Sequence, residues 1–147
     1  MKRAHVSMTD KRQWGDGPWQ SEPDELEFID KATGYACRIL RAWATGSLCG
    51  YVGVRADHPD YHKPYDDVNV EVHGGLSFAA HMLNEPALWW LGFDCAHFGD
   101  IQPRIRAICR DYLGWNDSEW GHERYRTIDY VREELARLAQ QLAKRAK

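Results

Sequence analysis

Apolar residues recur at every second position, or in short unbroken runs, over the first half of the chain. Residues 24–30 alternate, and two strongly apolar runs follow at 35–43 and 48–54, with the turn residues Ala-Thr-Gly-Ser between them at 44–47. Alternation with a period of two is typical of strands buried on one face, and a turn between two apolar runs is typical of a hairpin. The pattern therefore predicts one strand followed by a β-hairpin.

The stretch from Val68 to Asp100 predicts two further strands that bring polar residues together. Every second residue from Val68 to Val72 is valine, so this segment is predicted to be a strand with one buried and one polar face. The polar face carries Asp67, Asn69, Glu71 and His73. A short aromatic strand is predicted at 89–93, and the polar residues after it are Asp94, Cys95, His97 and Asp100. Any chemistry is expected where the ends of these two segments meet.

Two helices are predicted in the last third of the chain. Pro103 stands where a short helix can begin, and Gly114 is a suitable residue to end it. From Thr127, which can cap a helix start, apolar residues recur at steps of three and four. These residues are Ile128, Val131, Leu135, Leu138 and Leu142. This stripe predicts a long C-terminal helix that packs on the sheet.

Together these elements predict an α+β fold, with a mostly antiparallel sheet of four or five strands and one long C-terminal helix and one short helix on one face. A chain of 147 residues is normally one domain. Residues 1–23 have no apolar period and are rich in Gly and Pro, so they predict an N-terminal arm ahead of a single α+β domain at 24–147. Trp14 and Trp19 are expected to pin this arm onto the domain, because exposed indoles favour aggregation.

Composition restricts the classes of partner. The formal net charge is −3 and no basic stripe precedes the last few residues, which argues against a protein that grips nucleic acid. No apolar run approaches the roughly 20 residues that a membrane span needs, so no membrane partner is expected. The four cysteines, at 37, 49, 95 and 109, have no C-x-x-C spacing, and the first ten residues do not resemble a signal peptide. Reduced thiols and a cytoplasmic location are therefore expected.

Several motifs spread over nearly the whole chain resemble a widespread family of small proteins from tailed phages and prophages. They are GPWQSEPD at 17–24, LCGYVGV at 48–54, His58-Pro59, VHGGL at 72–76, WWLGFDCAH at 89–97 and YRTIDYV at 125–131. The resemblance implies a genomic setting, in a phage or prophage, and no particular reaction. The cytoplasm expected above is then that of the host cell. Small phage accessory proteins commonly act against host defence, and one route is to sequester or cleave a nucleotide signal, which is an argument by association.

His73, Asp94 and His97 have the residue types of a two-histidine, one-carboxylate site for Fe, Mn or Zn. The alternative is that they only hold glycine-containing turns by bonding backbone amides. Without a metal, His73 oriented by Glu71 or Asp94 would suit acid–base cleavage of a phosphodiester or glycosidic bond. Cys95 is a candidate nucleophile with a histidine as base, although a lone cysteine after a strand is most often a buried apolar residue. Whether a divalent metal is the cofactor stays open at this point.

A binding pocket without chemistry is the remaining interpretation. In it Tyr51, Trp89 or Trp90 would stack on a base. Lys63 would meet a phosphate, and His58 would lie in a loop that covers the pocket. The chain has no Walker loop and no G-x-G-x-x-G, G-x-S-x-G or H-E-x-x-H motif, so the common nucleotide-binding and hydrolase classes have no support.

Two functions from different classes follow. The first is a small pocket protein, expected as a homo-oligomer, that binds a polar nucleotide-like metabolite such as a host defence signal and can also cleave it. The second is a protein that inhibits a host macromolecule by surface contact without catalysis. The first function requires one polar pocket lined by His73, Asp94, His97, Glu71 and a tryptophan from position 89 or 90.

Overall fold

A computed structural model describes residues 3–5 and 11–147, and the remaining seven residues of the predicted arm lie outside this range. Its sheet has the strand order β1-β2-β3-β4-β6-β5, and every neighbouring pair is antiparallel. The strands are β1 (Arg3–His5), β2 (Glu25–Ile29), β3 (Ala36–Arg41), β4 (Leu48–Val54), β5 (Phe78–Met82) and β6 (Glu85–Asp94). The helices are α1 (Pro103–Leu113) and α2 (Ile128–Arg145), with short 3-10 turns η1 (Lys11–Trp14), η2 (Pro18–Gln20), η3 (Tyr65–Asp67) and η4 (Asp117–Trp120). The predicted α+β fold is confirmed.

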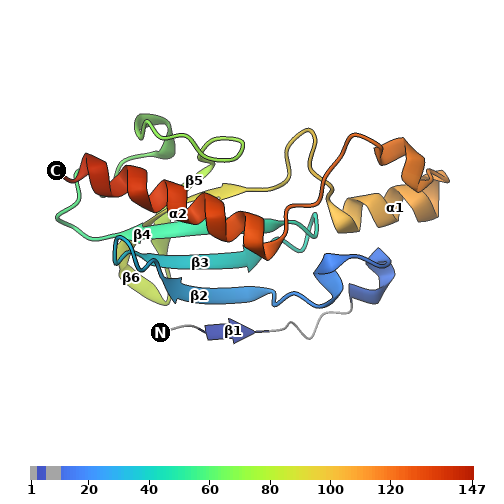
Figure 1. Cartoon of the computed structure of the whole chain (residues 1–147), viewed down its shortest axis with the longest axis horizontal. Coiled ribbons are helices and arrows are strands. Elements are labelled where there is room, and N and C mark those ends of the chain that lie inside the picture. Colours follow the sequence, from blue (N-terminus) through green and yellow to red (C-terminus); the bar gives the residue numbers. More distant parts are fainter. Residues whose placement is uncertain (1–2, 6–10) are drawn as a thin grey trace.

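Helix α2 lies along one face of the sheet, over β3 and β4 (Figure 1). Its predicted apolar stripe is buried against inward-facing side chains of the central strands. The main core includes Ile39, Val52, Leu91, Phe93, Val131, Leu135, Leu138 and Leu142. Gly50 of β4 lets the helix come close, because a Cβ atom there would stand only 2.8 Å from the Phe93 ring and 3.0 Å from Val131 Cγ1.

The prediction of a strand at residues 68–73 is wrong. The segment pairs with no neighbouring strand, and its backbone is bonded instead by side chains of α2. Glu71 N–H donates to Gln141 Oε1 at 2.7 Å, Gln141 Nε2 returns a bond to Glu71 O at 2.7 Å, and His73 N–H donates to Glu134 Oε1 at 2.7 Å. Its first and last valines are still buried, so the alternation reported burial correctly but not the hydrogen-bond partner.

The other predicted strands are present, and the hairpin β3–β4 is confirmed. The short strand predicted at 89–93 is the second half of β6, which begins at Glu85 and pairs with β5 across a tight turn. Strand β5 was not predicted, because its sequence, Phe-Ala-Ala-His-Met, lacks the β-branched residues that are typical of strands. The hairpin β5–β6 therefore forms the edge of the sheet.

A buried ionic network joins the N-terminal segment to the sheet. The Arg41 side chain is fully buried; Nε donates to Asp24 Oδ1 at 2.6 Å, and its terminal nitrogens donate to Glu22 Oε1 at 3.1 Å and to Tyr125 Oη at 3.0 Å. Lys11 Nζ, also buried, donates to Asp24 Oδ1 at 3.0 Å. Burial alone would lower the pKa of Arg41, but Tyr125, Asp24 and Glu22 raise it, so the guanidinium stays charged.

Helix α1 lies past the ends of the strands rather than beside α2, and it packs on η1 (Figure 1). Its first turn abuts the β3–β4 turn, where Arg104 N–H donates to Thr45 O at 2.9 Å. Trp14 and Trp19 are buried with Ala107 in a second apolar cluster, which confirms that these indoles pin the N-terminal segment.

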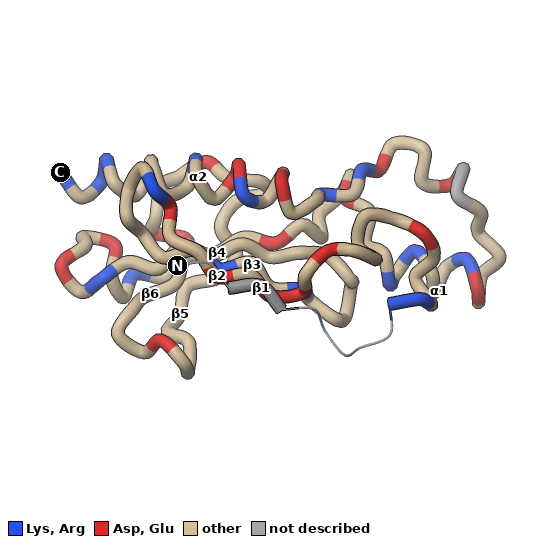
Figure 2. The backbone as a smooth tube through the Cα atoms, turned by 60° about the horizontal axis from the view of Figure 1, so that its bottom comes forward, with Lys and Arg blue, Asp and Glu red and all other residues tan. Residues whose placement is uncertain are grey.

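Charged residues of both signs are interleaved along the described backbone, without a long run of either sign (Figure 2). In the same view, the β5–β6 hairpin projects on the side of the sheet away from α2. Among the described residues, no helix has the length and apolar composition to cross a membrane.

Replacing Leu135 by Ala should destabilise the fold, because the Leu135 side chain is completely buried between α2 and the sheet. We expect a loss of about 2–5 kcal/mol in the free energy of unfolding, measured by urea denaturation. Leu83→Ala is the matched control, since Leu83 is fully exposed in the β5–β6 turn, and should change stability by less than about 0.5 kcal/mol. A similar loss in both variants would contradict the packing of α2.

Candidate functional site

A chain of three hydrogen-bonded side chains lies near the start of α2. His73 Nε2 is 2.8 Å from Asp100 Oδ2, and His73 Nδ1 is 2.7 Å from Tyr130 Oη. Because the carboxylate only accepts, Nε2 carries the ring proton, and Nδ1 of the neutral ring accepts from the Tyr130 hydroxyl. The Asp100 side chain is buried and His73 is only slightly exposed. A carboxylate, an imidazole and a hydroxyl in this order form a path for proton transfer.

Asp100 has two further donors. Arg126 Nε donates to Asp100 Oδ1 at 2.8 Å, and the backbone N–H of His97 donates to Oδ2 at 3.1 Å. Burial alone would raise the pKa of the Asp100 carboxyl, but the bonds from His73 and Arg126 outweigh burial and hold that pKa below its ordinary value. Asp100 is therefore an anion at neutral pH that fixes the orientation of the His73 ring and of the Arg126 guanidinium. Arg126 also lies 4.9 Å from the Tyr130 ring centre, a cation–π distance.

His97 and Asp94 lie beside this chain. The His73 and His97 ring centres are 6.0 Å apart, and His97 Nε2 is 3.2 Å from Asp94 Oδ1. Ser77 Oγ donates to Asp94 Oδ2 at 2.8 Å. Gly74, with φ of 68°, makes this approach possible, because a side chain there would run into the His97 ring. The structure thus gathers His73, His97 and Asp94, although the direct carboxylate partner of His73 is Asp100.

Glu71 and the two tryptophans do not join this cluster. The Glu71 side chain is exposed, and its segment is held by α2 rather than by a strand. Trp90 lies on the opposite face of the sheet, where the Arg38 guanidinium covers its ring at 5.8 Å. Trp89 lies in the middle of β6, five residues before Asp94, and its indole N–H donates to Lys63 O at 3.0 Å. The predicted pocket of His73 with Glu71 and a tryptophan is therefore corrected to a cluster without either.

The structure argues against Cys95 as a nucleophile. The thiol is buried, and burial together with the nearby Asp100 carboxylate raises its pKa, so the thiol stays protonated. Burial also raises the pKa of Cys49 to about 11 and that of Cys37 to about 12. All four cysteines are unpaired, as their spacing predicted.

The residues predicted to bind a ligand are dispersed. Tyr51 packs edge-on against Phe78 on the face of the sheet away from α2, with ring centres 5.1 Å apart. His58 is buried, and its ring bonds to Leu142 O through Nε2 at 2.8 Å and accepts from Asp60 N–H through Nδ1. Lys63 Nζ is 3.1 Å from Asp60 Oδ1. His58 and Lys63 therefore hold the loop at 55–67 rather than contact the His73 cluster.

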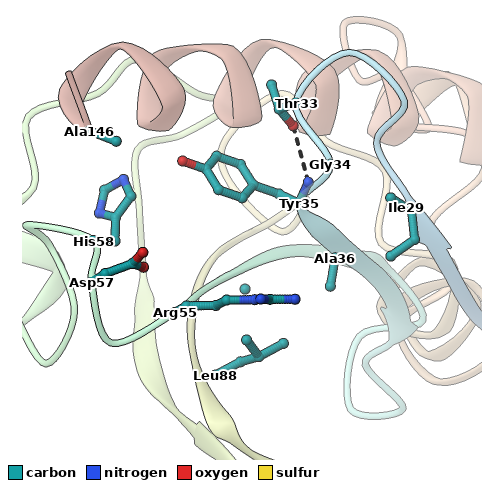
Figure 3. Close-up of a pocket in the computed structure, with 11 residues that line it drawn as sticks. Ile29, Thr33, Gly34, Tyr35, Ala36, Arg55, Asp57, His58, Leu88 and Ala146 are labelled. Atoms are coloured by element: carbon teal, nitrogen blue, oxygen red, sulfur yellow. Dashed lines mark hydrogen bonds between the residues drawn. The ribbon is translucent and has the colours of Figure 1, made fainter.

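A separate cavity of about 390 Å³ lies at the other end of the sheet (Figure 3). Arg55 extends into it between Ala36 and Leu88, while Asp57 and His58 lie at its side. His58 is the predicted ligand-binding residue that lines this cavity, with both ring nitrogens already engaged. The cavity is therefore distinct from the predicted site.

No group of three or more His, Cys, Asp or Glu residues converges in a metal-binding arrangement within the described residues. The proposed ligand set of His73, Asp94 and His97 is not assembled, because both ring nitrogens of His73 are used by Asp100 and Tyr130. The geometry around His73 therefore suits acid–base chemistry better than metal binding.

Tyr130 and Arg126 are the residues that sequence reasoning missed. Both belong to the motif at 125–131, but there Tyr130 resembles any partly buried residue at the start of an amphipathic helix. Arg126 comes just before the Thr127 cap and Tyr130 lies in the first turn of α2, and only the docking of α2 shows that Tyr130 meets His73 and that Arg126 meets Asp100.

Comparison of the chain with protein-family models, with curated proteins and with solved structures gave no match.

Asp100→Asn should reduce stability in a way that depends on pH. Because the folded-state pKa of Asp100 is lowered, its charge stabilises the fold above the unfolded-state pKa of about 4, and this contribution disappears as the pH falls through the folded-state value. We expect a loss of about 2–3 kcal/mol at pH 7 that narrows in acid, measured by urea unfolding across pH. Asp66→Asn, at an exposed position, is the control and should show little change. A deficit that is constant with pH would contradict this role.

Proposed function

We propose that this protein binds a small anionic, nucleotide-like metabolite beside the Asp100–His73–Tyr130 chain, and that this chain provides acid–base catalysis of its cleavage. The observation that carries the proposal is that both nitrogens of the His73 ring are hydrogen-bonded to side chains. Nε2 is 2.8 Å from Asp100 Oδ2, and Nδ1 is 2.7 Å from Tyr130 Oη. A turn-holding histidine needs one such partner, whereas proton transfer needs both.

The hydrogen-bonded side chains of Asp100, His73 and Tyr130 have two states, which differ by one proton on His73. With neutral His73, the Tyr130 hydroxyl donates to Nδ1. With cationic His73, both ring nitrogens donate, and the Tyr130 proton is free to bond a ligand oxygen. Burial raises the pKa of the Tyr130 hydroxyl even though Arg126 lowers it, so the phenol is a neutral donor at pH 7 rather than a nucleophile. Tyr130 would therefore give its proton to the leaving oxygen while water attacks the bond that breaks, and cationic His73 would return a proton to Tyr130. The proton that the attacking water loses restores cationic His73.

Two neighbouring groups suit an anionic ligand with a base. In the described structure, Arg126 uses Nε for Asp100 and forms no hydrogen bond through its terminal nitrogens, which would bind a phosphate. Phe98 is fully exposed in the same loop as His97 and would stack on a base. The phage-like motifs lead us to propose a host defence signal in the bacterial cytoplasm as the natural ligand.

Tyr130→Phe and His73→Asn should abolish ligand binding while the fold survives, since each removes polar contacts worth about 1–3 kcal/mol apiece. The measurement is the melting temperature against a panel of nucleotides, cyclic dinucleotides and ADP-ribose derivatives, with and without EDTA. The wild type should be stabilised by a member of the panel, and the two variants should not. Product analysis by chromatography would then show whether the wild type cleaves that compound.

Tyr65→Phe is the matched control for loss of a hydroxyl, because Tyr65 is exposed in η3. It should keep the full ligand response. A wild-type protein that responds to no member of the panel, or variants that respond as the wild type does, would contradict the proposed function.

One observation favours a second function, inhibition of a host macromolecule by surface contact. Large apolar side chains are exposed together on and after the last turns of α1, with Tyr112 82% and Leu113 63% exposed and Trp115 beside them. Such a patch is typical of a protein–protein contact. The second function would make the His73 cluster purely structural.

If the second function holds, Tyr112→Ser with Leu113→Ser should remove cross-links to one host protein, identified by mass spectrometry in host extract. His73→Asn should leave these cross-links unchanged, because Asp100 of the cluster precedes the start of α1, whereas Tyr112 and Leu113 lie at its end. The reverse pattern, with cross-links lost in His73→Asn and retained in the double variant, would contradict it.

A further inference from the structure

A second histidine pair lies toward the opposite end of β6 from Asp94. His62 comes from the loop at 55–67 and His81 from β5, and their Nε2 atoms face each other at 2.8 Å. Both side chains are exposed. Trp89, which packs against both rings, is five positions from Asp94 along the strand, or roughly 17 Å. This pair is therefore independent of the His73 cluster and of the function proposed there.

The orientation of His81 is fixed by the backbone. His81 Nδ1 is 2.8 Å from the carbonyl oxygen of Leu88, and since a carbonyl only accepts, Nδ1 carries the proton. The lone pair of the neutral ring is then on Nε2, which faces His62. A carbonyl that holds Nδ1–H in this way is the usual support for a histidine that ligates a metal through Nε2.

His62 is held in an unusual backbone conformation. Its φ is 71°, and within residues 3–5 and 11–147 no other residue except glycine has a positive φ. It is the third residue of a turn closed by Lys63 N–H bonding to Asp60 O at 3.0 Å, a position where Gly or Asn is favoured. Asp60 is anchored to α2 by two bonds from Arg145, at 2.6 and 2.8 Å. Backbone strain of this kind is typical of positions where the side chain has a function.

We propose that His62 and His81 form an open binding site for a divalent transition-metal ion such as Zn²⁺ or Ni²⁺. The two Nε2 atoms are the protein ligands, and water completes the coordination, since no third His, Cys, Asp or Glu converges there in the described structure. Metal–nitrogen bonds of about 2.0–2.1 Å place two such atoms roughly 3.0–3.4 Å apart. The rings therefore need to separate by about half an ångström. The ion takes the place of the proton between the two Nε2 atoms, which is released to solvent while His62 takes up a proton at Nδ1, so that both ligands are neutral imidazoles. Imidazole ligands select this class of ion over Mg²⁺.

The aromatic neighbours keep the two rings in position. The Tyr61 ring stacks on His62 at 4.1 Å between centres, and Trp89 lies edge-on to His62 and His81 at 5.2 and 5.0 Å. With both rings already facing each other, little side-chain freedom is lost when the ion binds. The site is thus organised before metal arrives.

The test is titration of the full-length chain with Zn²⁺, Ni²⁺ and Mg²⁺, followed by calorimetry and by melting temperature. The wild type should bind one Zn²⁺ or Ni²⁺ per chain and should not respond to Mg²⁺. His62→Asn should weaken Zn²⁺ and Ni²⁺ binding by at least about tenfold, as should His81→Asn. Because Asn tolerates positive φ, the metal-free melting temperature of His62→Asn should equal or exceed that of the wild type.

His122→Asn and His97→Asn are the controls, because His122 is exposed in the α1–α2 connection and His97 belongs to the other cluster. Both should bind Zn²⁺ and Ni²⁺ as the wild type does. The proposal is overturned if the wild type binds neither ion, if His62→Asn binds them with wild-type affinity, or if His97→Asn rather than His62→Asn removes binding. The first two results leave the function proposed beside His73 untouched, whereas the third would place the metal ion at His97, in the His73 cluster.

Discussion

The buried charge network around Arg41 is the constraint on which the rest of the structure depends. Two cations, Lys11 and Arg41, and two anions, Glu22 and Asp24, are removed from water together and compensate one another. Such a set contributes little net stability, but removal of one member leaves an uncompensated buried charge, at a cost of about 3–5 kcal/mol. The network therefore fixes where the N-terminal segment can lie against the sheet.

The network also fixes the start of α2. Glu22 Oε2 accepts from the backbone N–H of Ile128 at 3.0 Å, and Glu22 Oε1 accepts from the Tyr125 hydroxyl. An anion at this end of a helix is favoured by the helix dipole. Because the first turn of α2 is held here, Tyr130 reaches His73 and the residues just before the helix reach Asp100. The candidate site is thus assembled by the packing of distant segments rather than by one motif.

The other end of α2 organises the loop at 55–67 in the same way. Arg145 forms a fork on the buried Asp60 carboxylate, and these bonds hold the pKa of Asp60 below its ordinary value. His58 donates to the carbonyl oxygen of Leu142 in the last turns of the helix. One helix therefore anchors both the His73 cluster at its start and the turn that carries His62 near its end.

The sequence by itself determined the α+β class, the β3–β4 hairpin and the extent of α2, because periods of two and of three to four residues report directly which side of an element is buried. It also indicated that His73, Asp94 and His97 would lie near one another. Only the tertiary structure decided that residues 68–73 bond to α2 instead of a strand, and that Asp100 and Tyr130 are the partners of His73. Periodicity records burial along one segment, whereas hydrogen-bond partners depend on which segments meet, and that is settled by packing between residues far apart in the chain.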